Sequence, residues 1–183
     1  ELNLADFFRL NGISYEALPI ETNDEGKENL FAGRCDVYTT DASGLSSTRA
    51  AAADPSKWLV LPEIISKEPL GPLVRHGDHQ WGDVVRWSLN AMIIAEELGI
   101  TSENVDASKG SNVPEVLRLL GVEGSYGEML ELAPDWAYQI IKQIGNYSES
   151  YEANVGPDTP LEIARGLNAL WTQGGILYAP PFR

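Results

Sequence analysis

The segment from Gly33 to Asp41 has the residue types and spacing that best suit a binding site. It reads GRCDVYTTD, a turn followed by a β-branched and aromatic run that ends in a carboxylate. The run Cys35 to Thr40 is typical of a strand, and the alanine-rich stretch 42–53 is typical of a helix. Asp41, with Thr40 beside it, therefore stands where a strand gives way to a helix. Its carboxylate either caps that helix or faces a cleft and binds an ammonium group.

Both histidines fall in the run His76-Gly77-Asp78-His79, so a metal site has to be weighed. Histidines three residues apart around a glycine do not share a helix face, and no cysteine or further histidine is near in the sequence. The pattern favours a turn that leads into the helix beyond it. We predict no metal ligand and no cofactor.

Sequence motifs of the familiar catalytic classes are absent. The chain has no GxSxG, P-loop, HExxH, CxxC or GxGxxG motif. Carboxylates are abundant, but many of them, such as Glu25 and Glu115, stand where helix starts favour acidic residues. Abundance alone does not identify an acid and base pair, so nothing positive indicates an enzyme.

Composition describes an ordinary globular chain and excludes some partners. The 183 residues, 43% hydrophobic and 22% charged, suffice for one domain or two small lobes. The net charge of −14 argues against nucleic acid or an anionic membrane, because both need a basic face. The chain opens at Glu1 in a helical pattern without a capping residue, and we expect that it was cut from a longer one. The single cysteine, Cys35, is either a buried free thiol or one half of a pair.

Strands and helices alternate through the first third of the sequence. Apolar residues at helical spacing precede Asn11-Gly12, and a second helix is predicted from Glu25 to Ala32. Segments 13–20, 35–40 and 58–61 are predicted strands. This alternation predicts a parallel sheet with helices on its faces, where ligands bind at the carboxyl ends of the strands.

The remainder of the chain is predicted to be mainly helical. Segment 66–78, rich in proline and glycine, is predicted to be an extended crossing between two units. The predicted helices beyond it run from Trp81 to Gly99, from Pro114 to Leu120 and from Trp136 to Gly145. A fourth helix is predicted to begin after Thr159 as N-cap, because Pro160 and Glu162 follow it in the pattern of a capping box. Three tryptophans are assigned to the core on these helices: Trp81, Trp136 and Trp171.

Several motifs together resemble one family. They are ELNLAD at the start, GRxD at 33–36, TTD at 39–41, LPEIISKEPLGP at 61–72, WAY at 136–138, GNY at 145–147, RGLNALW at 165–171 and GGI at 174–176. The chain resembles the general L-amino-acid-binding periplasmic proteins of polar amino-acid ABC transporters, solute-binding proteins of the type II periplasmic-binding fold. The likeness runs over nearly the whole chain.

The resemblance implies an α/β fold of two lobes with parallel or mixed sheets and flanking helices, truncated here at the N-terminus. Residues 1–68 would be most of lobe two, 66–78 the hinge crossing, and 79–183 the C-terminal helical part of lobe one. Asp41 matches the family's ligand for the α-amino group, with Thr40 beside it. The threonine-rich loop that binds the α-carboxylate precedes Glu1 in relatives. A cysteine in the strand before that loop would pair with Cys35.

The function that the resemblance implies is capture of an L-amino acid in an interlobe cleft and delivery to a membrane permease, in the periplasm of a Gram-negative bacterium and without catalysis. Two alternatives stay open: an amino-acid-like dehydratase on the same fold, and an accessory protein that binds no ligand. Apolar helix faces left uncovered in a partial copy predict a swapped dimer or a complementary fragment as a further partner.

Overall fold

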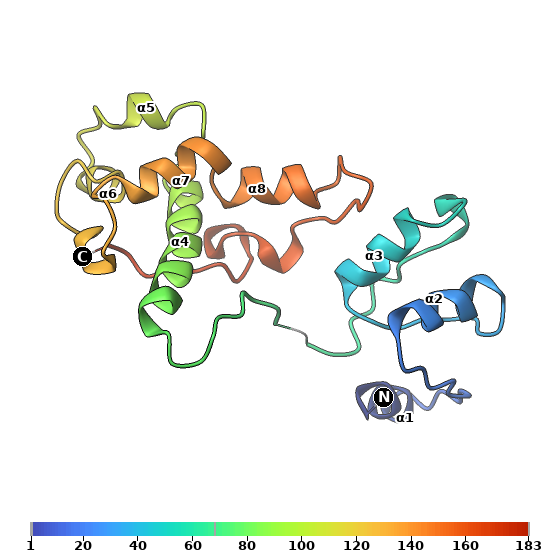
Figure 1. Ribbon diagram of the computed structural model, residues 1–183. Helices are drawn as coiled ribbons and strands as arrows, with labels where there is room; N and C mark the ends of the chain where they lie inside the picture. Colours follow the sequence, from blue (N-terminus) through green and yellow to red (C-terminus); the bar gives the residue numbers. More distant parts are fainter. Residues whose placement is uncertain (1, 68, 183) are drawn as a thin grey trace. The chain divides into compact units, whose positions relative to one another are not determined.

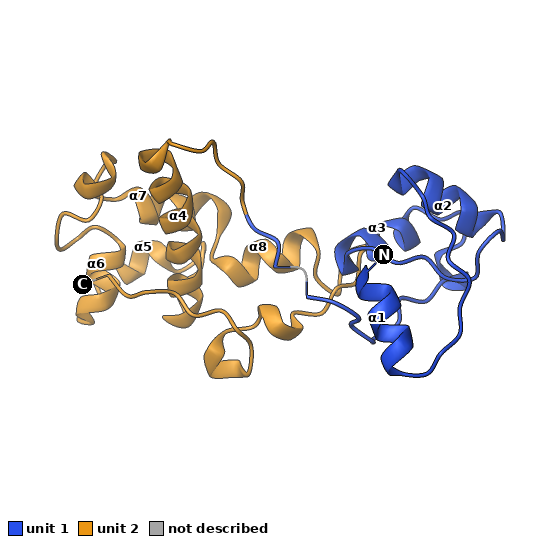
Figure 2. Cartoon of the chain, turned by 90° about the horizontal axis from the view of Figure 1, so that it is seen from below, with its two compact units in different colours: residues 1–71 blue, residues 72–183 orange. Residues whose placement is uncertain are grey.

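The computed structural model describes residues 2–67 and 69–182. They fall into two compact units, called here unit 1 (Glu1–Gly71) and unit 2 (Pro72–Arg183) and coloured blue and orange in Figure 2. The division lies within segment 66–78. Figure 1 shows that each unit consists of helices joined by irregular segments.

Unit 1 has three α-helices and one short 3-10 helix: α1 (Leu2–Leu10), α2 (Asn23–Phe31), α3 (Ala42–Ala50) and η1 (Pro55–Lys57). The three α-helices confirm the predicted ones, with ends that differ by a few residues. Gly12 and Gly33 take left-handed φ values of 65° and 68°, and these glycines let the chain turn after α1 and α2. Thr22 caps α2 by accepting from the backbone N–H of Glu25.

The predicted strands of unit 1 are wrong as paired strands. Segments 13–20, 35–40 and 58–61 carry no β-ladder, and the one β-bridge among the described residues joins Leu170 to Leu177 in unit 2. A strand exists only through hydrogen bonds to a neighbouring strand. Alternating apolar residues indicate that a segment could form a strand, but they do not show that a second strand lies beside it.

Aromatic contacts hold the irregular segments of unit 1 to its helices. The rings of Phe8 and Tyr15 have centroids 4.6 Å apart, and those of Phe31 and Trp58 are 5.1 Å apart. Gly26 admits the Tyr38 ring against α2, since a Cβ there would lie 2.5 Å from Tyr38 Cε2. No hydrophobic side chain among the described residues of unit 1 is buried, so these contacts take the place of a core.

Unit 2 contains the hydrophobic core. Its elements are α4 (His79–Glu97), α5 (Val105–Ser108), α6 (Pro114–Leu119), η2 (Glu128–Leu130), α7 (Trp136–Ile144), α8 (Tyr147–Asn154), η3 (Gly166–Asn168) and η4 (Trp171–Gln173). Helices α7 and α8 both contact α4, which runs through the middle of this unit in Figure 1. Ala91, Ala95 and Ile141 are fully buried in this core. Near the C-terminus, Phe182 packs its ring against Trp87 and Trp136.

The histidine-containing run at residues 76–79 is a turn into α4, as predicted. Asp78 is the N-cap of α4, and its carboxylate accepts a hydrogen bond of 3.1 Å from the backbone N–H of Trp81. At the other end, the predicted stop at Gly99 is confirmed by its φ of 67°. The predicted helix at 114–120 is confirmed as α6, and the one that starts at Trp136 as α7.

The predicted helix from Thr159 is wrong. The Thr159 hydroxyl accepts a hydrogen bond from the backbone N–H of Leu161, only two residues further on. Glu162 takes a left-handed φ of 52°, which a helix cannot contain. The capping box of this region belongs to α8, where Asn146 accepts from the N–H of Glu149 and the Glu149 carboxylate accepts from the N–H of Asn146.

The tryptophan assignments are right for one of the three residues. Trp136 is 7% exposed and belongs to the core. Trp81 is 54% exposed and Trp171 is 50% exposed, so the prediction that both are core residues is wrong. The helix predicted to carry Trp171 into the core does not form. Trp171 begins η4 instead, and its indole N–H donates to the Glu97 carboxylate at 3.0 Å.

Candidate functional site

A pocket of about 170 Å³ in unit 1 brings together the residues singled out in the sequence. Its walls come from the first turn of α1, from the residues that lead into α3, and from the segment that follows η1. The lining residues are Asn3, Leu4, Thr39, Thr40, Asp41, Ile65 and Ser66.

The start of α3 fixes the position of the two predicted site residues. Asp41 is the N-cap of α3, and its backbone carbonyl accepts from the N–H of Leu45 at 2.9 Å. The methyl group of Thr40 lies close to Gly44, where an added Cβ would come within 3.1 Å of it. Both side chains are half-buried. Thr40 and Asp41 are thus held by the first turn of the helix while they line the pocket.

The carboxylate of Asp41 does not cap α3. Its side chain accepts no hydrogen bond from the first turn of the helix, and it has no partner among the described residues. Thr22 and Asp78, at the N-caps of α2 and α4, do accept from backbone N–H groups. Of the two alternatives that the sequence leaves open for Asp41, the capping bond is not formed in the described residues, and binding of an ammonium group stays a prediction.

The pocket combines one negative charge with groups that attract an anion. Asp41 is the only ionisable residue among the seven described residues that line it, so an ammonium group is the ligand group that would neutralise it. Asn3 and Leu4 lie in the first turn of α1, where backbone N–H groups lack intrahelical acceptors and the helix dipole is positive. A ligand with both an ammonium and a carboxylate group would match both features. A single carboxylate does not make an acid and base pair.

Sequence reasoning missed Asn3, Ile65 and Ser66 as pocket residues. They lie some 25 to 40 positions from Asp41 along the chain, and no local pattern connects them with it. Cys35 is a free, half-buried thiol. Within residues 2–67 and 69–182, no three histidine, cysteine, aspartate or glutamate side chains come close enough together to hold a metal ion.

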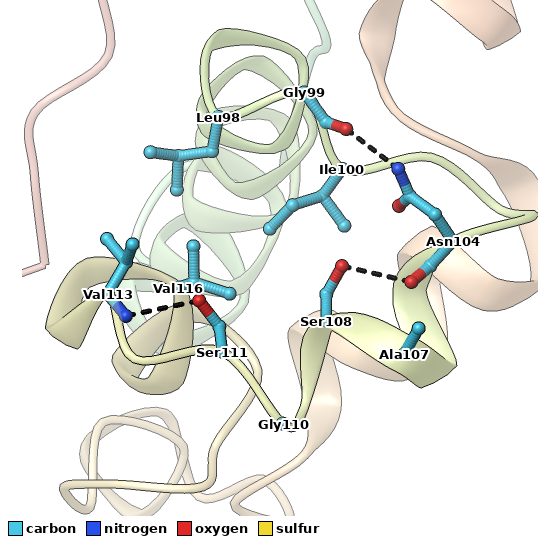
Figure 3. Close-up of a pocket in the computed structure, with 10 residues that line it drawn as sticks. All are labelled: Leu98, Gly99, Ile100, Asn104, Ala107, Ser108, Gly110, Ser111, Val113 and Val116. Atoms are coloured by element: carbon cyan, nitrogen blue, oxygen red, sulfur yellow. Dashed lines mark hydrogen bonds between the residues drawn. The ribbon is translucent and has the colours of Figure 1, made fainter.

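A second, larger pocket lies in unit 2, between the end of α4 and helices α5 and α6 (Figure 3). It has a volume of about 390 Å³, and none of the described residues that line it is charged. Its polar side chains already bind the chain itself: Asn104 donates to the Gly99 carbonyl, Ser108 donates to the Asn104 carbonyl, and Ser111 accepts from the Val113 N–H. The unit 1 pocket is therefore the better candidate, because it is lined by the charged Asp41, whose side chain makes no capping bond with α3.

None of the helices in the described part of the chain combines the length and apolar character that crossing a membrane requires.

Comparison with known proteins relates the whole chain to a class of receptors. No protein-family model matches it. The glutamate/glutamine/aspartate/asparagine-binding protein BztA of Rhodobacter capsulatus is 54% identical over an alignment of 184 positions, which covers all of this chain and 54% of BztA. The general L-amino acid-binding periplasmic protein AapJ of Rhizobium johnstonii is 54% identical over an alignment of 185 positions, which covers all of this chain and 54% of AapJ. A solved structure, an ABC transporter periplasmic binding protein from Brucella ovis with glutathione bound, matches with a TM-score of 0.92 and 50% identity, over this whole chain and 57% of that one.

The fold is therefore that of a periplasmic binding protein. Within that class, the chain is homologous to the amino-acid-binding components of ABC transporters and corresponds to their C-terminal part. The family resemblance and the periplasmic-binding fold class predicted from the sequence are confirmed at this level, while the predicted parallel or mixed sheets have no ladder among the described residues. The chain spans about half the length of these relatives.

Proposed function

We propose that the protein carrying this chain is the substrate-binding component of an amino-acid ABC transporter, which captures an L-amino acid in the unit 1 pocket. The observation that supports this most is the unpaired carboxylate of Asp41 in a pocket that also borders the start of α1. The names of the relatives support the ligand class, since AapJ is a general L-amino acid-binding protein and BztA binds acidic and amide amino acids.

In this proposal the ligand is held by its two charged groups. Its ammonium group donates to Asp41, and the Thr40 hydroxyl accepts or donates a further hydrogen bond beside it. Its carboxylate lies at the N-terminus of α1, where the backbone N–H groups have no acceptor within the helix. Because every L-amino acid has both groups, this part of the site recognises all of them. Glutathione, bound by the Brucella ovis protein, carries the same pair of groups on its γ-glutamyl residue.

The two units have different roles in the proposal. Residues 1–68 form most of the lobe that binds the ammonium group, 66–78 form the hinge, and 79–183 belong to the second lobe. Closure of the lobes around the amino acid would shield the ion pair at Asp41 from water and present a closed receptor to the permease. Location in the periplasm of a Gram-negative bacterium follows from the same proposal.

The proposed protein releases its ligand unchanged and is not an enzyme. The homologues are named as binding proteins, and the lining of the pocket offers a single carboxylate where acid and base catalysis would need a matched partner. A swapped dimer or a complementary fragment, as a cover for an apolar helix face such as that of Trp81, Val85 and Met92 in α4, stays a prediction.

The test is isothermal titration of the protein that carries this chain with L-glutamate, L-glutamine and L-alanine, followed by analysis of the recovered ligand. All three should bind and be recovered intact. Glutarate, which is glutamate without its α-amino group, should not bind. A recovered product that has lost water would indicate the dehydratase alternative, and binding of none of the three would indicate the accessory protein.

A further inference from the structure

The geometry points to Asn3 as a specificity-determining residue of the unit 1 pocket, one that recognises the polar end of the ligand's side chain. The inference rests on the proposed function and extends it to the part of the ligand that differs between amino acids. Asn3 lies in the first turn of α1 and lines the same pocket as Asp41. Its carboxamide has no hydrogen-bond partner among the described residues.

The two asparagines of this region differ in what they bind. Asn11, just beyond the other end of α1, donates from Nδ2 to the Phe7 carbonyl at 2.8 Å and is engaged with its own helix. Asn3 does not cap α1, since it lies inside the helix rather than before it. Its side chain is exposed at the pocket wall and has no hydrogen bond to the residues that the structure describes, so we infer that its donors and its acceptor serve a ligand.

Among the described lining residues, the others are less suited than Asn3 to bind the polar end of the ligand's side chain. Asp41 is assigned to the ammonium group, and Leu4 and Ile65 are apolar. The hydroxyl at Thr39 is shorter than a carboxamide and can offer one donor, and Ser66 already makes an interaction of its own. No cation lines the pocket among the described residues, so a ligand's side-chain carboxylate finds no ion-pair partner there.

A carboxamide can bind both acidic and amide side chains. It donates through its two N–H bonds to a carboxylate, and it accepts through its oxygen from the N–H of a ligand carboxamide. Because it carries no charge, it does not favour one of these ligands by an ion pair or reject the other by repulsion. A contact with Asn3 therefore predicts a site that takes glutamate and glutamine with similar affinity and favours both over alanine.

The first experiment is titration calorimetry of Asn3→Ala in the protein that carries this chain. We expect affinity for L-glutamate and L-glutamine to fall roughly 3- to 30-fold, as for loss of a hydrogen bond, while affinity for L-alanine changes by less than about twofold. Leu2→Ala is the matched control, because Leu2 lies in the same turn of α1, is 82% exposed and does not line the pocket. It should leave all three affinities unchanged.

A second variant separates the polar contact from any effect on α1. Asn3→Asp keeps the shape and favours the start of a helix, but it removes the donors and adds a negative charge. Affinity for L-glutamate should fall about tenfold relative to that for L-glutamine, because like charges then face each other.

Each other outcome overturns the inference. An equal loss for all three ligands in Asn3→Ala would mean that Asn3 binds the α-carboxylate, and no loss would mean that it does not touch the ligand. If either result is found while binding still depends on Asp41, the inference about Asn3 is wrong and the proposed function is unaffected. If the parent protein binds no amino acid, the inference and the proposed function are both wrong.

Discussion

At the scale of single residues, Arg165 holds the segment after α8 onto α4. Its Nη2 donates to both carboxylate oxygens of Glu96 at 3.0 Å, and the two side chains are 15% and 9% exposed. The guanidinium carbon also lies 5.2 Å and 5.3 Å from the ring centroids of Tyr147 and Tyr151. Ion pairs this far from water are costly to break, because the remaining partner stays charged and buried.

Arg165→Ala should therefore lower the free energy of unfolding by about 3 kcal/mol, because it leaves the Glu96 carboxylate unpaired. Arg86→Ala is the matched control, since its ion pair with Asp83 has side chains 71% and 49% exposed, and it should cost less than about 0.5 kcal/mol. Urea denaturation of the chain followed by circular dichroism measures both. Equal effects of the two variants would contradict the assignment.

A second residue, Asp106, joins α5 to α7. Its carboxylate accepts from Lys142 Nζ at 2.7 Å and from the Tyr138 hydroxyl at 2.8 Å, and Lys109 Nζ lies 3.2 Å from the centroid of the Tyr138 ring. The hydrogen bond from Lys142, and after it the one from Tyr138, lowers the pKa of Asp106 below its ordinary value of 3.8.

The contribution of Asp106 to the stability of the fold should decrease at low pH. Its pKa is lower in the folded chain than in the unfolded one, so the contribution is complete above pH 3.8 and is lost as the pH falls through the lower, folded pKa. Lys142→Met should raise the pKa of Asp106, and Lys109→Met should raise it less. Titration of the side-chain carboxyl by NMR measures these shifts. An Asp106 pKa that does not respond to Lys142→Met would contradict the assignment.

At the scale of elements, local signals explain which helices the sequence could predict. Gly12, Gly33 and Gly99 end three helices, and each takes a left-handed conformation that depends on nearby residues alone. The pattern at Thr159 fits both a capping box and a shorter turn, and local sequence does not choose between them. Strands need a distant partner, so the alternation in segments 13–20 and 35–40 is not sufficient for a ladder.

The capping box of α8 is the feature at this scale whose removal should lower the stability of the fold most clearly. Asn146 accepts from the Glu149 N–H at 2.9 Å and donates to the Ile100 carbonyl at 2.8 Å while it is only 5% exposed. Asn146→Ala should therefore lower the free energy of unfolding by about 1 to 3 kcal/mol. Ser148→Ala, two residues on in the same helix, should stay within about 0.5 kcal/mol. Thermal unfolding compares the two, and an unaffected Asn146→Ala would contradict this role.

At the scale of the molecule, the two units differ in what stabilises them. The buried hydrophobic residues of the described chain, such as Val105, Leu119 and Ile141, all belong to unit 2. In unit 1 the buried residues among those described are Gly26, Asn29, Ser46 and Thr48. Because its apolar side chains are at most half-buried, unit 1 gains less from hydrophobic burial, the main favourable term in folding, than unit 2 does. The sequence predicts Asp41 from its local pattern, whereas the rest of the pocket depends on contacts across unit 1 that no local pattern encodes.

Hydrogen exchange of the 183-residue chain should reveal this difference. Backbone amides of α4 and α7 should exchange slowly, through global opening of the core, and those of α1 and α3 should exchange faster by local opening. Mass spectrometry of the peptic peptides measures both in one sample. Equal protection in the two units would contradict a core confined to unit 2.

The central claim is that Asp41 binds the ligand's ammonium group, and the direct measurement is the Kd of Asp41→Asn for L-glutamate, L-glutamine and L-alanine by calorimetry. Loss of one partner of a shielded charge pair costs about 2 to 5 kcal/mol, so each Kd should rise by roughly one and a half to more than three orders of magnitude. The Tm without ligand should not change, because the Asp41 side chain makes no capping bond with α3. An Asp41→Asn protein that binds all three amino acids as tightly as the parent would contradict the account.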